Sequence, residues 1–283
     1  MNRSLHNIHV FRNGVVVLRN HHHLSSCSRR SYTTSASSIN PDEVKFFSRL
    51  SSQWWDERGE FAMLHRMNPA RMSFIRDKLS QCFDEEATAA GLDASPRTVG
   101  KQLLLEGMEV LDIGSGGGLL SESLARLGAK TTGIDANLRY IHGTAESIVA
   151  EALEYDAVFS MEVLEHVENP YDFLVNCVKL VKPGGHLFLS TISRTPLSYF
   201  LTIFMAEQAL GLVHSGTHNY SKFVKSSELV EFFSRPEIAK EAEVRQIHYN
   251  PLVGTWTIEP LASLPTIRGA FECNYLFWAR KPA

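Results

Sequence analysis

The chain has 283 residues, 44% of them hydrophobic and 21% charged, which suits one well-packed globular domain and argues against a disordered or fibrous protein. Its net charge of −3 conceals an asymmetry, because the first 40 residues contain five arginines and no Asp, Glu or Lys. The remaining chain has 23 basic and 31 acidic residues, a net charge of −8. Nucleic acid is therefore not an expected partner, since binding it requires clustered Lys and Arg against the phosphates.

Residues 1–40 are rich in Arg, Ser and His and contain one short apolar run, Val15 to Leu18. This composition is typical of a mitochondrial transit peptide, with a disordered tail as the alternative. We expect one folded domain over residues 41–283. No uninterrupted apolar span in it reaches the roughly 18 residues that a transmembrane helix needs.

The predicted domain opens with helices and continues as an α/β pattern. Apolar residues recur at helical intervals from Asp42 to Trp55, and a second helix is expected after Asn68-Pro69. Short apolar runs then alternate with helical stretches, which is typical of βαβ units and a mostly parallel sheet. The expected strands are residues 109–113, 130–134, 138–142, 155–160, 186–191, 244–248 and 275–279.

The first of these strands runs into a glycine-rich turn, residues 114–118, which a helix over 119–127 follows. Glycines let a ligand approach the backbone, and the start of the helix presents free N–H groups to an anion. Asp135 ends the next strand about 20 residues later, where nucleotide-binding α/β folds place a ribose ligand. The acidic Asp112 and the G-x-G-x-G spacing favour S-adenosylmethionine over a nicotinamide cofactor, and a dehydrogenase stays open as an alternative.

Several separate motifs occur in an order that resembles the ubiquinone biosynthesis O-methyltransferases. They are Trp54–Asp56, Gly59–Phe61, Leu64–Arg71, Met161–Val167, Gly216–His218 and His248–Pro251, and residues 156–161 and 181–187 are similar to late motifs of class I methyltransferases in general. The resemblance implies a Rossmann-like class I fold, a mostly parallel central sheet with helices on both faces. It also implies that Arg71, Gly114, Asp135 and Met161 contact S-adenosylmethionine.

The same resemblance implies a reaction and a place in the cell. The expected reaction is methyl transfer to catechol-type hydroxyls of polyprenylated intermediates, a polyprenyl-dihydroxybenzoate and a demethylubiquinol. The expected location is the matrix face of the mitochondrial inner membrane, in peripheral association with the lipid and with other ubiquinone-synthesis proteins.

Glu162, Glu165 and His166 form a polar cluster after the strand at 155–160. If a helix starts just after Met161, the three side chains lie on one of its faces. Two carboxylates and an imidazole suit Mg²⁺ or another divalent cation, and the family resemblance supports all three as metal ligands. His166 is also the expected catalytic residue, as a general base that takes the phenol proton without a metal. A solvated helix start is the remaining interpretation.

The run from Leu197 to Val213 contains Glu207 as its only charge. At the substrate end of the sheet such a segment could form a lid that dips into lipid and accommodates an isoprenoid tail. A buried core helix or an oligomer interface explains the same pattern.

One feature departs from the family. Only Ala136 and Asn137 separate Asp135 from the next expected strand, whereas the family has a helix of several turns there. Parallel neighbours need a crossover of a dozen residues or more, so the chain apparently lacks the crossover helix after the second strand. We expect exposed apolar surface, a looser hold of Asp135 on the cofactor and reduced stability. A catalytically weak chain that acts as a scaffold in a membrane-associated ubiquinone-synthesis complex is the alternative to an active enzyme.

Overall fold

The computed structural model describes residues 18–19, 47–92, 103–136, 141–142, 144–203, 219–259 and 272–283. Most of the segment predicted as a transit peptide lies outside these residues, as do the start of the first expected helix and residues 204–213 of the apolar run. In the described part of that helix, residues 47–50 are helical and Ser51–Gln53 form a 3-10 turn.

One mixed sheet organises the described chain, in the order β1-β7-β9-β6-β5-β2-β3-β4, with β8 paired to β7. The strands β4, β3, β2, β5 and β6 pair in parallel, and β9 runs antiparallel between β6 and β7. β1 pairs with the outer edge of β7. Their bounds are β1 Leu18–Arg19, β2 Glu109–Ile113, β3 Lys130–Asp135, β4 Ile141–His142, β5 Tyr155–Met161, β6 Val181–Ile192, β7 Glu241–Asn250, β8 Thr255–Ile258 and β9 Asn274–Arg280.

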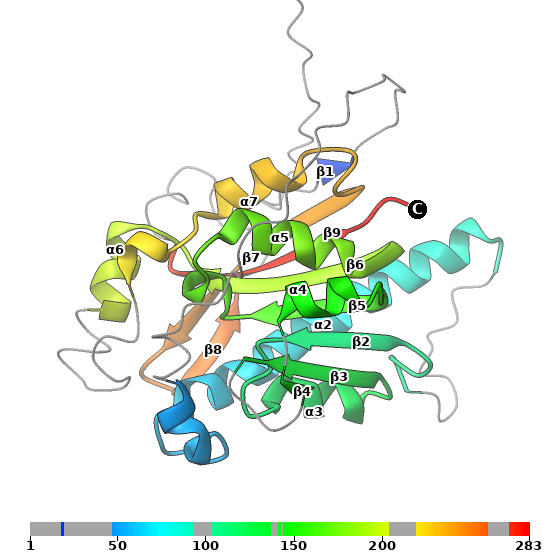
Figure 1. Cartoon of the computed structure of the whole chain (residues 1–283). Helices are drawn as coiled ribbons and strands as arrows, with labels where there is room; N and C mark the ends of the chain where they lie inside the picture. The colour runs from blue at the N-terminus through cyan, green and yellow to red at the C-terminus, as the bar shows by residue number, and fades with distance from the viewer. Residues whose placement is uncertain are drawn as a thin grey trace, which may run out of the picture.

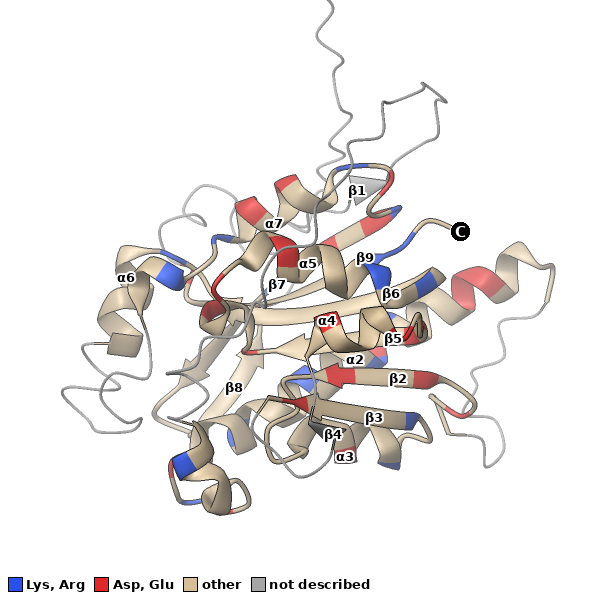
Figure 2. Ribbon diagram, viewed as in Figure 1, with Lys and Arg blue, Asp and Glu red and all other residues tan. Residues whose placement is uncertain are grey.

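Helices cover both faces of the sheet (Figure 1), as the sequence predicts. α2 and α3 pack on one face, and α4, α5 and α7 pack on the other. Acidic residues mark the C-terminal half of α2 and the length of α7 (Figure 2). The helices are α2 Ala62–Ala89, α3 Leu119–Arg126, α4 Ala145–Ala150, α5 Pro170–Lys179, α6 Pro196–Ser198 and α7 Ser226–Phe233.

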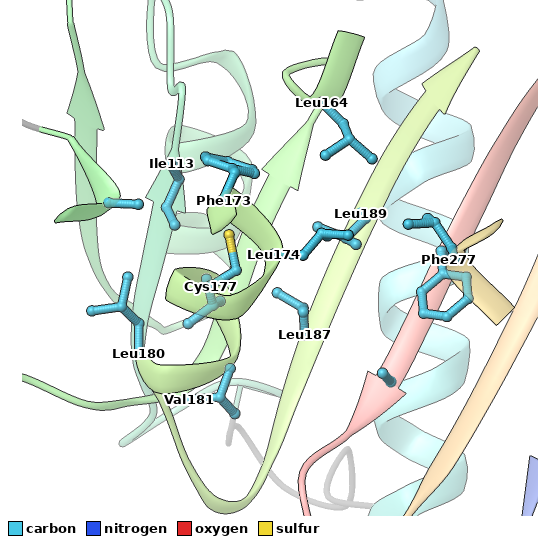
Figure 3. Packing of buried hydrophobic residues seen from close by; sticks show 14 of the residues in the cluster. Ile113, Leu164, Phe173, Leu174, Cys177, Leu180, Val181, Leu187, Leu189 and Phe277 are labelled. Carbon is cyan, nitrogen blue, oxygen red and sulfur yellow. The ribbon is translucent and has the colours of Figure 1, made fainter. Parts of the chain in front are cut away.

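The core under α5 shows why these residues form these elements. Phe173, Leu174 and Cys177 recur at helical spacing and point at the sheet, where they meet Leu187 and Leu189 of β6 (Figure 3). The two leucines are two positions apart, because alternate side chains of a strand share a face. Each buried side chain of this size stabilises the fold by roughly 1.5–3 kcal/mol.

α2 packs its long buried stripe against the opposite face. The stripe contains Arg71, Phe74, Ile75 and Lys78, all nearly inaccessible to solvent. The Lys78 ammonium lies 4.4 Å from the centre of the Trp278 ring and pairs with the buried carboxylate of Glu243. Because buried charges require such partners, this contact fixes the rotation of α2 and with it the position of Arg71, two turns earlier.

Two elements differ from the sequence predictions. α2 begins at Ala62 rather than after Pro69, and Pro69 lies inside the helix. The missing hydrogen bond of the proline is tolerated because its neighbours Met67 and Asn68 are buried, and Asn68 donates to Ser123 Oγ of α3 at 2.9 Å. The short strand β8 was not predicted; it pairs with β7 to form a hairpin.

The connection after β3 joins it to a short parallel strand, β4. Among the described residues no helix lies between β3 and β4, and β4 is reduced to two residues, Ile141 and His142, paired in parallel with Ile134 and Asp135. The expected exposure of apolar surface is not found on β3, where Ile134 is fully buried. The other positions of β3 are polar or glycine, so removal of a helix leaves no large apolar side chain uncovered there.

Candidate active site

A cavity of about 430 Å³ lies at the carboxyl ends of β2, β5 and β6, where ligands of open α/β sheets bind. It is lined by six of the residues singled out from the sequence, which come from α2, the glycine-rich turn and the segment after β5. These residues are Arg71, Gly114, Met161, Glu162, Glu165 and His166. Apolar side chains from residues 47–67 and from Phe200 and Leu201 close the rest of the cavity.

The glycine-rich turn is tied to the neighbouring strand. The N–H groups of Gly114 and Ser115 both donate to the Ile134 carbonyl, at 2.9 and 3.0 Å. Gly114 has a φ of +71°, and a Cβ there would lie 2.4 Å from the side chain of Val163. Only glycine fits this conformation and this contact. The Ser115 hydroxyl is buried, lines the cavity and has no hydrogen-bond partner, so it can serve a ligand.

Asp135, the fourth residue predicted to contact the cofactor, does not line the cavity. Its carboxylate accepts a hydrogen bond from the Gly116 N–H at 3.0 Å. The Trp54 ring covers the same turn: a Cβ on Gly116 would lie 2.4 Å from it. The Trp55 indole donates to the Gly117 carbonyl at 3.1 Å. In the structure Asp135 therefore supports the turn, and its contact with the cofactor stays a prediction.

Asp112 lies at the end of β2 with 2% of its surface exposed. Burial raises the pKa of its carboxyl from 3.8 to about 7, although the Ser121 hydroxyl donates to it at 2.6 Å. The carboxyl lines the cavity beside the turn. It is therefore divided between its neutral and charged forms near neutral pH, and any cationic ligand that binds beside it favours the charged form.

Arg71 reaches the cavity from α2 with only 4% of its surface exposed. Its Nη2 lies 3.2 Å from Glu162 Oε1, close enough for an ion pair but not aligned as a hydrogen bond. Nε and Nη2 are buried and make no hydrogen bond. A guanidinium with a free pair of donors matches a carboxylate, so the carboxylate of the methionine part of S-adenosylmethionine fits this position.

The residues after β5 do not form the α-helix on which the sequence argument for the acidic cluster depended. Glu162 adopts a left-handed conformation with a φ of +56°, and only Leu164–His166 form a 3-10 turn. Hydroxyls of β6 position the carboxylates instead. Ser190 Oγ donates to Glu162 Oε1 at 2.6 Å, and Thr191 Oγ1 donates to Glu165 Oε2 at 2.7 Å.

Glu165 is a buried carboxyl with one of its two oxygens hydrogen-bonded, to Thr191. Burial raises its pKa most, and the neighbouring Glu162 carboxylate raises it further. Its Oε1 is buried, lacks a hydrogen-bond partner and belongs to a side chain that lines the cavity. This oxygen fits a cation. However, within the residues that the structure describes, no three His, Cys, Asp or Glu side chains are arranged to hold a metal ion, so the three predicted ligands share a wall without converging.

The β7–β8 hairpin supplies a further polar wall, of which the sequence argument included only the motif His248–Pro251 and gave it no role in the site. His248 Nε2 lies 3.0 Å from Glu259 Oε1, and the Trp256 indole N–H is buried without a partner. His248 and Trp256 both line the cavity. His248 is near the carboxyl end of a strand parallel to β6, and that position alone could have singled it out.

Comparison with known proteins agrees with this fold. Residues 63–246 match the sequence family described as "Methyltransferase domain". A solved S-adenosylmethionine-dependent methyltransferase from Thermotoga maritima superposes with a TM-score of 0.52 over 84% of this chain and 99% of its own, at 15% identity, which shows the fold alone. The class is thus that of S-adenosylmethionine-dependent methyltransferases.

Curated relatives narrow the class to one family. A "Ubiquinone biosynthesis O-methyltransferase" of Maricaulis maris is 36% identical over 89% of this chain and 96% of its own length. A protein of the same name from Caulobacter vibrioides is 39% identical over 78% of this chain and 89% of its own. The chain belongs to the ubiquinone biosynthesis O-methyltransferase family, and it is an S-adenosylmethionine-dependent O-methyltransferase.

Proposed function

We propose that this protein methylates catechol-type hydroxyls of polyprenylated precursors of ubiquinone, a polyprenyl-dihydroxybenzoate and a demethylubiquinol. The observation that carries the proposal is a single cavity that joins the residues suited to the cofactor with the polar cluster after β5. Its predominantly apolar walls suit an aromatic ring with an isoprenoid tail. The names of the relatives support the same pathway.

The residues of the cavity have separate roles in cofactor binding and in methyl transfer. S-adenosylmethionine supplies the methyl group as a sulfonium. Arg71 binds the methionine carboxylate, while Gly114 and Met161 hold the cofactor against the ends of β2 and β5. In the absence of a metal ion, His166 would take the phenol proton, so that the oxygen attacks as a phenolate. The apolar walls exclude water from the reacting atoms.

We further propose that Glu162, Glu165 and His166 hold a divalent cation, Mg²⁺ in the first instance. Such an ion would favour the phenolate and orient the catechol. The unpartnered Glu165 Oε1 supports this, because a buried carboxylate oxygen requires a compensating donor or cation. Convergence of the three side chains would require Glu162 to turn from its present partner, Arg71.

Titration of the purified chain with S-adenosylhomocysteine, followed by a methyl-transfer assay on a short-tailed catechol, tests the reaction. We expect binding and turnover, with turnover lost in chelator and restored by Mg²⁺. Turnover that is insensitive to chelator would leave His166 as a metal-free base. A folded protein that fails to bind S-adenosylhomocysteine would overturn the enzymatic proposal.

Peripheral membrane binding is proposed from apolar side chains near the cavity. Phe200 and Leu201 line the cavity and are 48% and 41% exposed. Beside them in the lining is Pro251, whose neighbours Leu252 and Val253 at the hairpin tip are 93% and 66% exposed. Among the described residues no helix is long and apolar enough to cross a membrane. A surface of this kind suits shallow insertion that lets the isoprenoid tail stay in lipid.

Co-sedimentation with vesicles that contain cardiolipin tests this surface. The double variant Leu252→Ser with Val253→Ser should lose most vesicle binding and keep turnover on a short-tailed, soluble catechol. Leu92→Ser, which changes an exposed leucine at the end of α2, is the matched control. Equal binding of all three proteins would contradict a lipid role for the hairpin tip.

We propose a location and an assembly from the composition of residues 1–40 and from the pathway. The acid-free composition of residues 1–40 supports import into mitochondria, and the matrix face of the inner membrane is where the lipid substrate and other ubiquinone-synthesis proteins would meet this chain. Import of a reporter fused to residues 1–40 into isolated mitochondria is the expected result. Replacement of the five arginines by Gln should abolish it, and unchanged import would argue against a transit peptide.

A scaffold role is the second candidate, and the shortened connection after β3 favours it. If the chain is a scaffold, the unmodified protein should show no turnover, and the His166→Ala variant should still bind in the ubiquinone-synthesis complex. An enzyme would turn over and lose that activity in the same variant, so one substitution separates the two functions.

A further inference from the structure

The β7–β8 hairpin presents two aromatic side chains with polar groups to the cavity. Tyr249 of β7 and Trp256 of β8 are directly opposed across the two strands, and their ring centres lie 5.4 Å apart. Opposed residues share a face of a hairpin, and both side chains line the cavity. The alternation along β8 agrees, because Thr255 and Thr257 are exposed while Trp256 and Ile258 are partly buried. The face of the hairpin that bears Tyr249 and Trp256 is therefore turned inward.

The indole of Trp256 has a hydrogen-bond donor without an acceptor. Its Nε1 is buried and makes no hydrogen bond in the described structure. An indole N–H can only donate, and a buried donor that stays unpaired costs free energy. The ring itself packs against the core cluster that contains Ile247. Packing thus accounts for the ring, and the N–H is left for a ligand with an acceptor oxygen.

The hydroxyl of Tyr249 is a second donor beside it. The hairpin lies next to the N-terminal half of α2 (Figure 1), and Nη1 of Arg66 in that helix donates to Tyr249 Oη at 2.9 Å. A hydroxyl that accepts a hydrogen bond keeps its own hydrogen, so it can still donate. Acceptance from a cation polarises the hydroxyl and strengthens the bond that it donates.

The carboxylates of the cavity come from other elements. Those that line it among the described residues are Glu60, Asp112, Glu162 and Glu165. Glu259, which follows β8 and contacts His248, is not part of the lining. The hairpin therefore contributes donors to the cavity and no carboxylate, so an anionic group of a ligand is best accommodated there.

We propose that Tyr249 and Trp256 bind the carboxylate of a dihydroxybenzoate acceptor and select it over a catechol that lacks this group. The inference rests on the proposed function and names the residues that distinguish its two acceptors. Two donors on neighbouring rings match the two oxygens of one carboxylate. The ring hydroxyls, which are donors, are then left for the residues after β5. A demethylubiquinol carries no carboxylate and depends less on the pair.

Two short-tailed ligands that differ only in the carboxylate, a dihydroxybenzoate and the matching catechol, test this selection. Calorimetric titration with S-adenosylhomocysteine present and absent measures their binding without turnover. We expect the unmodified protein to bind the dihydroxybenzoate about tenfold more tightly than the catechol. A site built to bond an oxygen should reject the analogue without it.

Trp256→Phe keeps an aromatic ring and removes the N–H. It should lower the preference for the dihydroxybenzoate to roughly threefold, with the affinity for the catechol unchanged. Tyr249→Phe, which removes only the hydroxyl, should act in the same way, and the double variant should bind both ligands equally. In steady-state assays the KM for the dihydroxybenzoate should rise while kcat stays constant.

Two further variants separate the donors from their surroundings. Thr257→Val changes the exposed neighbour of Trp256 on β8 and should retain the full preference. Arg66→Met keeps both donors and removes the cation that polarises Tyr249, so it should lower the preference by less than Tyr249→Phe does.

The outcomes that would overturn the inference differ from failure of the proposed function. Equal affinity of the unmodified protein for the two ligands removes the carboxylate site, as does a full preference in both Phe variants. Equal weakening of both ligands in Trp256→Phe would show that the indole serves the ring or the wall of the cavity. Absence of methyl transfer to either acceptor, with the binding preference intact, would contradict the proposed function and leave the carboxylate site standing.

Discussion

The two sides of the cavity are built in opposite ways. On the β5–β6 side, Glu165 is buried and Glu162 is partly buried, and a hydroxyl of β6, 26 or 28 residues away, donates to each carboxylate. On the β3–β4 side, the fifth parallel strand is two residues long, and Asp135 supports the glycine-rich turn rather than the cavity.

The β5–β6 side is thus suited to the chemical step, and the β3–β4 side to binding the cofactor. On the side suited to proton transfer and cation binding, Glu162 has a left-handed backbone conformation and one oxygen of Glu165 is buried without a hydrogen-bond partner. Both features cost free energy in the folded state. The side suited to adenosine has no helix between β3 and β4 among the described residues. We therefore expect changes on the β3–β4 side to alter the affinity for the cofactor. We expect changes in the acidic cluster to alter kcat/KM, and by a larger factor.

The largest effect is expected at the enclosed side. Glu165→Gln should lower kcat/KM by on the order of 10³-fold, because it removes a carboxylate that we propose as a ligand of the cation. Its unfolding temperature should stay equal or rise, since the burial cost of the carboxylate disappears. Steady-state kinetics and thermal unfolding measure the two quantities.

Glu168→Gln is the control for this substitution, because Glu168 is exposed on the same segment and pairs with Lys222 at the surface. It should change neither quantity. A Glu165→Gln protein with near-normal kinetics would show that the enclosed side serves the fold alone.

At the other end of β6, His186 is buried as a neutral imidazole, and we expect acidification to lower the free energy of unfolding by about 3 kcal/mol for this reason. Burial lowers the pKa of His186 from 6.5 to about 4, and its Nδ1 accepts from the Trp278 indole at 3.3 Å. The unfolded chain binds the proton more readily, so the stabilisation is complete above pH 6.5 and is lost as the pH falls through 4. Urea unfolding at pH 7 and pH 4.5 should show this loss.

His186→Gln should flatten that dependence, although its stability at pH 7 should be lower because the fit to Trp278 is disturbed. His248→Gln changes a half-exposed histidine and should retain the slope of the unmodified chain. An unchanged slope in His186→Gln would assign the acid sensitivity to other groups.

A moderate effect is expected at the shortened side. Insertion of a designed crossover helix between Asp135 and Ile141 should tighten S-adenosylhomocysteine binding roughly tenfold and raise the unfolding temperature by a few degrees, since 1 kcal/mol corresponds to about 2–4 °C in a domain of this size. A Gly/Ser insertion of equal length is the control and should do neither. No gain from the helical segment would show that the short connection is sufficient.

The sequence predicts the parts of this molecule that depend on local pattern. β2 occurs at residues 109–113 as expected, and the glycine-rich turn and both helix layers are confirmed. The start of α2 and the turn at Glu162 were not predictable locally. The first depends on burial around Pro69, and the second on a hydroxyl 28 residues away in β6. The cover of Trp54 over the glycine-rich turn was likewise not predictable locally, because Trp54 lies about 60 residues before that turn in the chain.

The smallest effect is expected at the part of the cofactor side that is intact. Ser121 of α3 donates to Asp112 Oδ2 at 2.6 Å, and Ser121→Ala removes this bond at a cost of about 1 kcal/mol. The loss raises the pKa of Asp112 further, so that more of the carboxyl is neutral at pH 7 and a cationic ligand gains less from it. S-adenosylhomocysteine binding should weaken roughly threefold, while Mg²⁺ affinity stays unchanged. A change in Mg²⁺ affinity would mean that the two sides communicate through α3, and that the contrast between them is less complete than their structures indicate.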